Sequence, residues 1–204
     1  MIGAGTKRAF DVVVAGFTLL VLAPFMVLIA ISVKLDSPGP VVYRQTRIGR
    51  GGRPFTLLKF RSMVRDADRL APNVSPSGDP RVTRMGRFLR AWYLDELPQL
   101  LNVLLGTMSL VGPRPETPEF VEHYTSSERR VLGVRPGIVG PSTLAYMHEP
   151  DLLASSAAPE DVYVAIVLHE RVRLDLAYIG SQSLSSDIRL MYRQLLAILR
   201  RVRE

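Results

Sequence analysis

The chain has 204 residues and a formal net charge of +7, and it contains no cysteine. The length suits one domain of ordinary size plus a short additional segment. The absence of cysteine excludes disulfides, thiolate catalysis, Cys-ligated zinc and iron–sulfur clusters. The basic balance indicates an anionic partner such as acidic lipid, nucleic acid or a phosphate-bearing substrate.

The first predicted element is an apolar segment, residues 12–33, which carries no charged side chain. Its length is close to the roughly 20 residues that cross a bilayer core, and it is too long for the apolar part of a typical signal peptide. Pro24 predicts a kink, so the segment can either cross the membrane or turn and leave by the side it entered. Basic residues flank both ends and tend to stay in the cytoplasm, so we favour re-entry over a span. A buried helix of a soluble protein is the remaining alternative.

A small β-hairpin is predicted next. The Ser-Pro-Gly-Pro sequence at residues 37–40 indicates a sharp break after the apolar segment. Residues 41–43 and 55–58 have the composition of short strands, and three glycines lie in the connection between them. Residues 66–80 then predict a polar loop.

The rest of the chain predicts four helices, at residues 82–94, 97–105, 161–178 and 186–202. Gly106 follows the second of these helices, in a usual C-terminal position for glycine. Two proline-rich loops are predicted at residues 111–115 and 135–141. The fold class is therefore expected to be α+β and mainly helical.

The acidic pair Asp95-Glu96 is the main candidate for chemistry. Pro98 suits the first turn of a helix, so both carboxylates are expected at a helix start, where the macrodipole and free N–H groups favour negative charge. Taken alone, the pair more readily indicates an Asp helix cap beside a solvated Glu.

Basic residues near this pair in the sequence, or in segments whose position is constrained, give it more weight. Arginines that follow a helical spacing precede the pair, and others lie in short segments rich in Phe, Gly or Pro. Such settings suit two-pronged contacts with phosphate, although any one arginine is more often a surface charge. The basic candidates are Lys59, Arg61, Arg90, Arg114 and Arg135.

Other candidates are weaker. There is no Walker A sequence, the three histidines have no ligand spacing, and Asp175 by itself indicates a capping or ion-pair partner within a helix. Basic residues with scattered aromatics could suit nucleic acid, but the apolar N-terminal segment argues against a nucleic-acid partner.

Together, these motifs resemble the bacterial monotopic phosphoglycosyl transferases, the small-subfamily type of bacterial sugar transferase. The most specific stretches are Asp-Glu-Leu-Pro-Gln-Leu at residues 95–100 and Met-Ser-Leu-Val-Gly-Pro-Arg-Pro at residues 108–115. The resemblance covers nearly the whole chain. Further similar stretches lie at residues 7–11, 37–41, 45–49, 59–63, 135–138 and 175–178.

The resemblance implies transfer of a sugar-1-phosphate from a nucleotide sugar, expected to be a UDP-sugar, to a polyprenyl phosphate, with release of a nucleoside monophosphate. By position, Asp95 would be the nucleophile that forms a phosphosugar-aspartate intermediate, and Glu96 would bind Mg²⁺. Carboxylate is a competent nucleophile toward phosphorus, and Mg²⁺ prefers oxygen ligands. Phosphate- or substrate-binding roles are expected for Lys59, Arg61, Arg90, Arg114, Arg135 and Asp175.

The implied organisation is a kinked, re-entrant membrane-anchoring helix over residues 1–36 and a helical catalytic domain with a small β-hairpin and proline-rich loops over residues 37–204. That domain is expected on the cytoplasmic face of the bacterial inner membrane, in exopolysaccharide biosynthesis. Ala23 and Pro24 form the expected kink. Ala23 stands where the family usually has a serine, whose hydroxyl could satisfy a carbonyl freed by the kink.

Residues 141–149 also depart from the family pattern and are a candidate region for donor contact, so the resemblance does not identify the sugar. A homodimer is left open. The alternatives to an active transferase are a basic membrane-surface scaffold and a degenerate transferase, and the intact acidic pair argues against the second.

Overall fold

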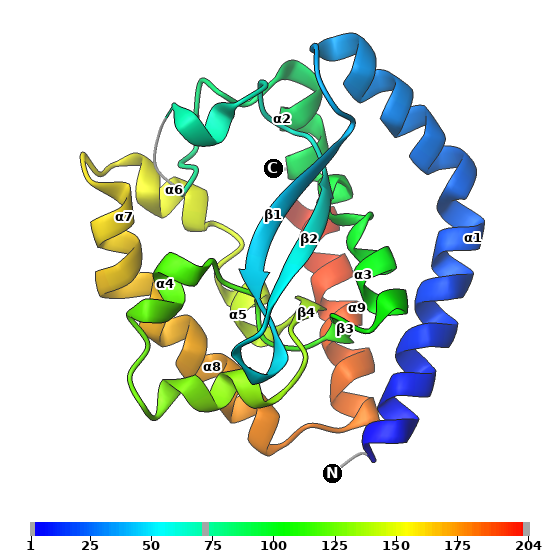
Figure 1. The fold of residues 1–204 in the computed structure, drawn as a ribbon, viewed down its shortest axis with the longest axis vertical. Coiled ribbons are helices and arrows are strands. Elements are labelled where there is room, and N and C mark those ends of the chain that lie inside the picture. Colours follow the sequence, from blue (N-terminus) through cyan, green and yellow to red (C-terminus); the bar gives the residue numbers. More distant parts are fainter. Residues whose placement is uncertain (1–2, 71–73, 202–204) are drawn as a thin grey trace.

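The computed structural model describes residues 3–70 and 74–201. Its first element, α1 (Ala4–Asp36), is a single helix that continues through Pro24 and ends where the predicted anchor ends. Figure 1 shows this helix bowed around one side of the body. Among the described residues, α1 is the one helix long and apolar enough to cross a membrane, and 11% of its apolar window is buried within the protein. Re-entry itself stays a prediction.

The N-terminal end of α1 is bonded to the body by charged side chains. Lys7 Nζ donates to Asp187 Oδ2 at 2.6 Å. Asp11, which is 2% exposed, accepts from Ser109 Oγ at 2.8 Å and from the backbone N–H of Leu110 at 3.2 Å. A buried carboxylate with charge-assisted partners fixes this end strongly.

The C-terminal end of α1 is bonded to the same body. Arg61 Nη2 donates to the backbone oxygen of Ser37 at 2.6 Å and to that of Val33 at 3.3 Å. Asp36 Oδ2 accepts from the N–H of Met85 at 3.0 Å. Arg61 thus satisfies carbonyls that a helix C-terminus leaves without helical partners. Both ends of the apolar helix therefore lie against one folded unit.

One stripe of α1 belongs to the core, whereas other faces of the helix are open. Ala15, Ile29 and Val33 are buried against the body, but Phe17 and Leu20 are 67% and 76% exposed. Leaving a large apolar side chain in water forgoes about 2 kcal/mol each. An apolar surface of this extent marks an interaction site.

The predicted hairpin is confirmed. Strands β1 (Val42–Ile48) and β2 (Pro54–Phe60) pair antiparallel, and both are longer than the sequence predicted. Their connection includes Gly51 and Gly52, both at φ +72°, a left-handed conformation that glycine adopts without steric cost.

Helix α3 (Gln99–Leu105) is held against β2 by one side chain. Asn102 Oδ1 accepts from the N–H of Leu58 at 3.0 Å, and its Nδ2 donates to the carbonyl of Thr56 at 2.7 Å. Gly106 ends the helix at φ +84°, as predicted.

The prediction of a helix over residues 82–94 was wrong about where the helix ends. Helix α2 begins after Thr83, whose Oγ1 accepts from the N–H of Gly86, and spans Arg84–Ala91. Tyr93 then takes φ +56°, and Leu94–Glu96 forms a 3-10 turn before α3. A left-handed residue cannot continue a right-handed helix, so the chain turns there.

The two proline-rich stretches contain short strands rather than loops alone. Strands β3 (Ser109–Val111) and β4 (Gly137–Val139) pair in parallel. A Cβ on Gly137 would lie 2.1 Å from the backbone nitrogen of Gly112, so this close approach requires glycine. Three residues are too few to show the alternation by which a strand is predicted.

The remaining elements are short helices followed by two longer ones. The helix predicted over residues 161–178 is present, but its first part is the short helix Pro159–Val162 followed by a π-helical stretch, Tyr163–Leu168. The helix predicted over residues 186–202 begins two residues earlier, at Leu184, and residue 202 lies outside the described residues. Part of the predicted polar loop, residues 71–73, also lies outside them, and the loop contains a 3-10 turn at Ala67–Arg69. These elements are α4 (Pro118–Glu122), a 3-10 helix (Glu128–Gly133), α5 (Pro141–Ala145), α6 (Glu149–Ala154), α7 (Pro159–Val162), the π-helix (Tyr163–Leu168), α8 (His169–Gly180) and α9 (Leu184–Arg201).

Candidate active site

A pocket of about 1090 Å³ opens between the hairpin, α2, the 3-10 turn before α3, and the start of α6. Six of the eight predicted catalytic or substrate-binding residues line it, although they come from separate parts of the chain. Those six are Lys59, Arg61, Arg90, Asp95, Glu96 and Arg114. Arg135 and Asp175 do not line it.

The acidic pair sits in the wall of this pocket. Asp95 and Glu96 are 7% and 8% exposed, so they are not solvated surface carboxylates. The N–H of Glu96 donates to the carbonyl of Tyr93 at 3.3 Å, which closes the 3-10 turn. The turn thereby presents two adjacent carboxylates from buried backbone.

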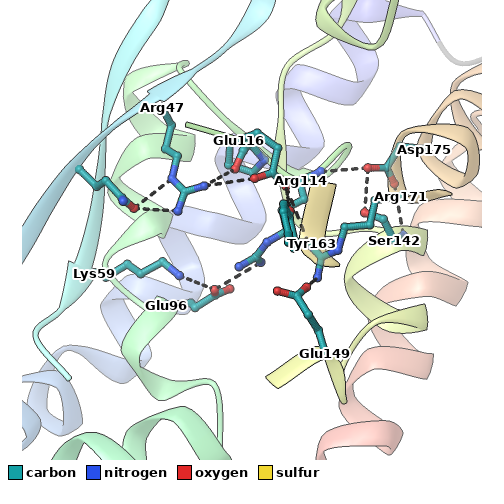
Figure 2. A network of polar contacts seen from close by, with 12 residues as sticks. Arg47, Lys59, Glu96, Arg114, Glu116, Ser142, Glu149, Tyr163, Arg171 and Asp175 are labelled. Atoms are coloured by element: carbon teal, nitrogen blue, oxygen red, sulfur yellow. Dashed lines mark hydrogen bonds and ion pairs between the residues drawn. The ribbon is translucent and has the colours of Figure 1, made fainter. Parts of the chain in front are cut away.

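Glu96 is surrounded by cations. Lys59 reaches from β2, and its Nζ lies 2.8 Å from Glu96 Oε1; Arg114 Nη1 lies 3.8 Å from the same oxygen (Figure 2). Burial raises the pKa of Glu96, but the positive charges of Lys59 and Arg114 outweigh burial and hold the pKa below its ordinary value. Glu96 is therefore ionised at neutral pH.

Asp95 is shifted the other way. Burial raises its pKa above the ordinary value, against the attraction of Lys59, and the neighbouring charge of Glu96 raises it further. A carboxylate whose pKa is raised is more basic, and so a stronger nucleophile once ionised. Two adjacent carboxylates whose pKa values shift in opposite directions are typical of sites where the two groups have different roles.

Arg90 supplies positive charge to the site and, within the described part of the chain, forms no ion pair with a carboxylate. Its Nε donates to Ser62 Oγ at 2.8 Å and its Nη1 to Ser75 Oγ at 2.7 Å. Burial lowers the pKa of the guanidinium, and the charge of Asp95 acts in the opposite direction. Neutral hydroxyl partners orient the guanidinium while leaving its charge available to an anion.

Asp175 lies behind the pocket and holds Arg114 in place. Its Oδ2 accepts from the backbone N–H of Arg114 at 3.1 Å and from Ser142 Oγ at 2.8 Å. Burial raises the pKa of Asp175 to about 6. The structure thus gives Asp175 contacts with the protein itself, not with the pocket.

Arg61 and Arg135 also have structural partners. Arg61 caps α1, as described above, and Arg135 Nε donates to the carbonyl of Gly106 at 2.8 Å, at the end of α3. The sequence grouped these arginines with the phosphate-binding candidates because composition does not reveal such carbonyl partners.

Sequence reasoning missed a second charged network among the residues that line the pocket (Figure 2). Glu116 lies 3.4 Å from Arg47 Nη1 and accepts a hydrogen bond from the Tyr163 hydroxyl at 2.8 Å. Arg171 pairs with Glu149 beside them. Glu116 directly follows Pro113-Arg114-Pro115 and could have been found from that position, whereas nothing in the sequence marks the buried face of the helix that carries Arg171.

The segment that departs from the family pattern faces the pocket. Thr143, Tyr146, Met147 and Glu149 all contribute to its lining. These positions are therefore placed to contact whatever the pocket binds.

A magnesium ion would fit this site only with help from a substrate. Among the described residues, no group of three or more His, Asp or Glu side chains could hold a metal. Mg²⁺ commonly takes one or two carboxylates together with substrate phosphates and water. The adjacent carboxylates of Asp95 and Glu96, which line the pocket, match that arrangement.

Comparison with known proteins gives one consistent result. The sequence model of the bacterial sugar transferase family matches residues 2–201. The chain is 41% identical over 191 residues to the UDP-glucose:undecaprenyl-phosphate glucose-1-phosphate transferase of Escherichia coli (strain K12), covering 91% of this chain and 38% of that protein.

Two further relatives are matched over most of this chain but over different shares of their own length. Identity is 35% over 198 residues to the UDP-N-acetylgalactosamine-undecaprenyl-phosphate N-acetylgalactosaminephosphotransferase of Aeromonas hydrophila, covering 95% of this chain and 43% of that protein. It is 39% over 198 residues to the exopolysaccharide production protein PSS of Rhizobium leguminosarum bv. phaseoli, covering 91% of each. The chain thus spans less than half the length of two of these relatives.

Proposed function

The chain belongs to the bacterial sugar transferase family, and we propose that it moves a sugar-1-phosphate from a nucleoside diphosphate sugar to a polyprenyl phosphate. One observation carries this proposal: the buried pair Asp95-Glu96 lines a large pocket together with the guanidinium of Arg90, which is hydrogen-bonded to serine hydroxyls. A pocket with nucleophilic carboxylates and surplus positive charge suits a substrate that brings a diphosphate.

In the proposed first step, a carboxylate oxygen of Asp95 bonds to the phosphorus that carries the sugar. The bond from that phosphorus to the bridging oxygen of the diphosphate breaks, and the bridging oxygen leaves with the nucleoside monophosphate. In the second step, a phosphate oxygen of the polyprenyl phosphate bonds to the same phosphorus, and the bond to Asp95 breaks. The carboxylate is regenerated, and two easier displacements replace one difficult step.

The basic residues of the pocket hold charge during these steps. Lys59 and Arg114 are 2.8 and 3.8 Å from Glu96, and they are placed to contact phosphate oxygens brought next to that carboxylate. The positive charge of Arg90 acts on Asp95, and its guanidinium is held by the hydroxyls of Ser62 and Ser75. Fixed donors of this kind stabilise the charge that develops on phosphoryl oxygens.

We propose Mg²⁺ as the cofactor, held by Glu96 and the diphosphate of the donor. A divalent cation at that position would supply charge neutralisation for the departing phosphate. The lowered pKa of Glu96 favours metal binding, because a carboxylate ligand must be deprotonated.

The donor is proposed to be a UDP-sugar. The names of the E. coli and A. hydrophila relatives specify UDP-linked donors and undecaprenyl phosphate, but one sugar is glucose and the other N-acetylgalactosamine. Identities of 41% and 35% do not decide between them. The name of the R. leguminosarum relative, exopolysaccharide production protein PSS, supports a role for the proposed reaction in making an extracellular polysaccharide.

We further propose that α1 enters and leaves the bacterial inner membrane from the cytoplasmic side. Lys7 and Asp11 at one end, and Asp36 at the other, all bond to the domain that carries the pocket. A helix that crossed the bilayer fully would carry its N-terminal end away from that domain and break the first two contacts. The exposed apolar face of α1 would then lie in lipid.

The reaction is tested with the full chain in membranes or detergent micelles. Undecaprenyl phosphate, Mg²⁺ and either UDP-glucose or UDP-N-acetylgalactosamine are supplied, and release of UMP is measured. We expect sustained release of UMP, beyond one equivalent per protein, only when metal and lipid acceptor are both present. No release with any of a panel of nucleotide sugars would favour the non-enzymatic scaffold.

Topology is tested separately. Single cysteines introduced at residue 3 and residue 200 of this cysteine-free chain should both be labelled only from the cytoplasmic side. Labelling of the first from the periplasmic side would refute re-entry.

A further inference from the structure

The C-terminal end of α9 reaches the catalytic pocket. Arg201, at the end of that helix, lines the pocket together with Tyr93 and Met147. Its Nη1 donates to the carbonyl of Met147 at 2.7 Å and contacts the Tyr93 hydroxyl at 3.3 Å. The guanidinium carbon lies 6.0 Å from the centroid of the Tyr93 ring. These contacts orient the side chain.

The charge of Arg201 is not neutralised at close range. Within the described residues, no carboxylate lies within 4.0 Å of its guanidinium nitrogens, and both of its hydrogen bonds use Nη1. Lys59 and Arg171, by contrast, each pair with a glutamate. An oriented guanidinium with neutral partners retains N–H donors for an incoming anion.

Arg201 contacts the residue that precedes the turn bearing the acidic pair. Its partner Tyr93 is the left-handed residue from which the 3-10 turn with Asp95 and Glu96 begins. Burial raises the pKa of the Tyr93 phenol. The Tyr93 side chain thus contacts Arg201, while its backbone begins the turn that carries the acidic pair.

We propose that Arg201 binds phosphate oxygens of a substrate held at Asp95. This inference rests on the proposed function and extends it to the C-terminal helix. The phosphate can belong either to the donor diphosphate or to the acceptor lipid, because both must meet at Asp95. An arginine suits either one through two parallel N–H donors.

The neighbouring arginine provides a matched control. Arg200 is exposed on α9 and does not line the pocket. If the basic end of the helix acts only through attraction to acidic lipid, the two arginines should be equivalent. If Arg201 binds phosphate, only its loss should affect substrate affinity.

The experiment compares the full-length variants Arg201→Met, Arg201→Lys and Arg200→Met. In the transfer assay, Arg201→Met should raise the KM of one substrate about 10-fold, and Arg201→Lys should restore part of the loss, because lysine keeps the charge without the planar donors. A rise in the KM of the nucleotide sugar assigns Arg201 to the donor, and a rise in that of the lipid assigns it to the acceptor. Arg200→Met should stay within about 2-fold of the unmodified chain.

Binding of inorganic pyrophosphate, followed by calorimetry, provides a readout that does not depend on turnover. Arg201→Met should weaken that binding, whereas Arg200→Met should leave it unchanged. Absence of transfer by the unmodified chain would refute the proposed function but not this inference. Equal effects of the two methionine variants, or a lower melting temperature of Arg201→Met with both KM values and pyrophosphate affinity unchanged, would overturn the inference.

Discussion

Lys59 and Glu96 form an ion pair of 2.8 Å that joins the hairpin to the turn before α3, across 37 residues of sequence. Both side chains are largely buried, and both line the pocket. The pair therefore sets the protonation of the predicted metal ligand and also connects the two elements that form one wall of the site. Replacing Lys59 therefore tests how strongly its charge controls the protonation of Glu96.

We expect Lys59→Met to move the acid-side loss of activity to higher pH. Lys59 helps to hold the pKa of Glu96 below its ordinary value, so without it burial pushes that pKa upward and Glu96 is protonated at a higher pH. The value of kcat/KM at neutral pH should fall about 100-fold. The measurement is the pH profile of UMP release. Arg44→Met, on an exposed position of β1, is the control, and an unshifted acid limb in Lys59→Met would contradict the prediction.

Asp95→Asn should abolish transfer, with a loss of at least about 1,000-fold, because an amide cannot act as the nucleophile. A donor labelled in its sugar phosphate and supplied without acceptor should leave label on the unmodified protein but not on this variant. The control is Asp66→Asn: Asp66 also lines the pocket but is exposed, and asparagine tolerates its φ of +58°. Normal activity of Asp95→Asn would remove the nucleophile assignment.

Asp11→Ala should destabilise the attachment of α1. It would leave Ser109 Oγ and the N–H of Leu110 without their buried acceptor, at a cost of about 3 kcal/mol. The urea midpoint of the solubilised protein measures this loss. Asp36→Asn, at the exposed opposite end of the helix, should cost less than about 1 kcal/mol, since the amide oxygen can still accept from Met85. Equal midpoints for the two variants would show that the Asp11 contacts stabilise the fold no more than the Asp36 contact does.

Asp175→Asn should flatten the dependence of stability on pH. The pKa of Asp175 is about 6 in the folded protein, above the ordinary value of about 4 for the unfolded chain. Between about pH 4 and 6 the folded protein therefore keeps a proton on Asp175 that the unfolded chain has lost. The free energy of unfolding falls by up to about 3 kcal/mol as pH rises through this range. Asparagine does not titrate, so the fall should be smaller in melting curves taken between about pH 4 and 6.

Ser142→Ala provides the matched variant for that prediction. The Ser142 hydroxyl donates to Asp175 and favours the ionised carboxylate, so its removal should extend the decline in stability to higher pH. Identical slopes for the unmodified chain and both variants would show that Asp175 is not the group responsible.

Much of the local structure could be predicted because it depends on short-range physics. The apolar run predicted α1, the glycine and proline breaks predicted the hairpin, and Gly106 ended α3 as expected. Errors arose where three-residue strands were too short to show a period, and where Tyr93 took a left-handed conformation that tertiary contacts stabilise against its local cost.

The sequence predicted which residue types belong to the candidate site, but not how their side chains are arranged. Asp95, Glu96, Lys59, Arg90 and Arg114 meet in the pocket. The sequence did not distinguish these from arginines that cap helices, because the partner of such an arginine is a backbone carbonyl, and any residue has one. Arg135 is of that kind, and Arg61, which also lines the pocket, bonds to carbonyls at the end of α1.

The sequence by itself determined the family, the apolar helix and the adjacent carboxylates, since these depend on residue type and order along the chain. Only the tertiary structure decided how those carboxylates ionise, because their pKa shifts come from burial and from Lys59 and Arg114, which are distant in sequence. It also brought Arg201 to the pocket and both ends of α1 to one body. Contacts of this kind depend on which faces of packed elements meet, and that is fixed by the whole fold.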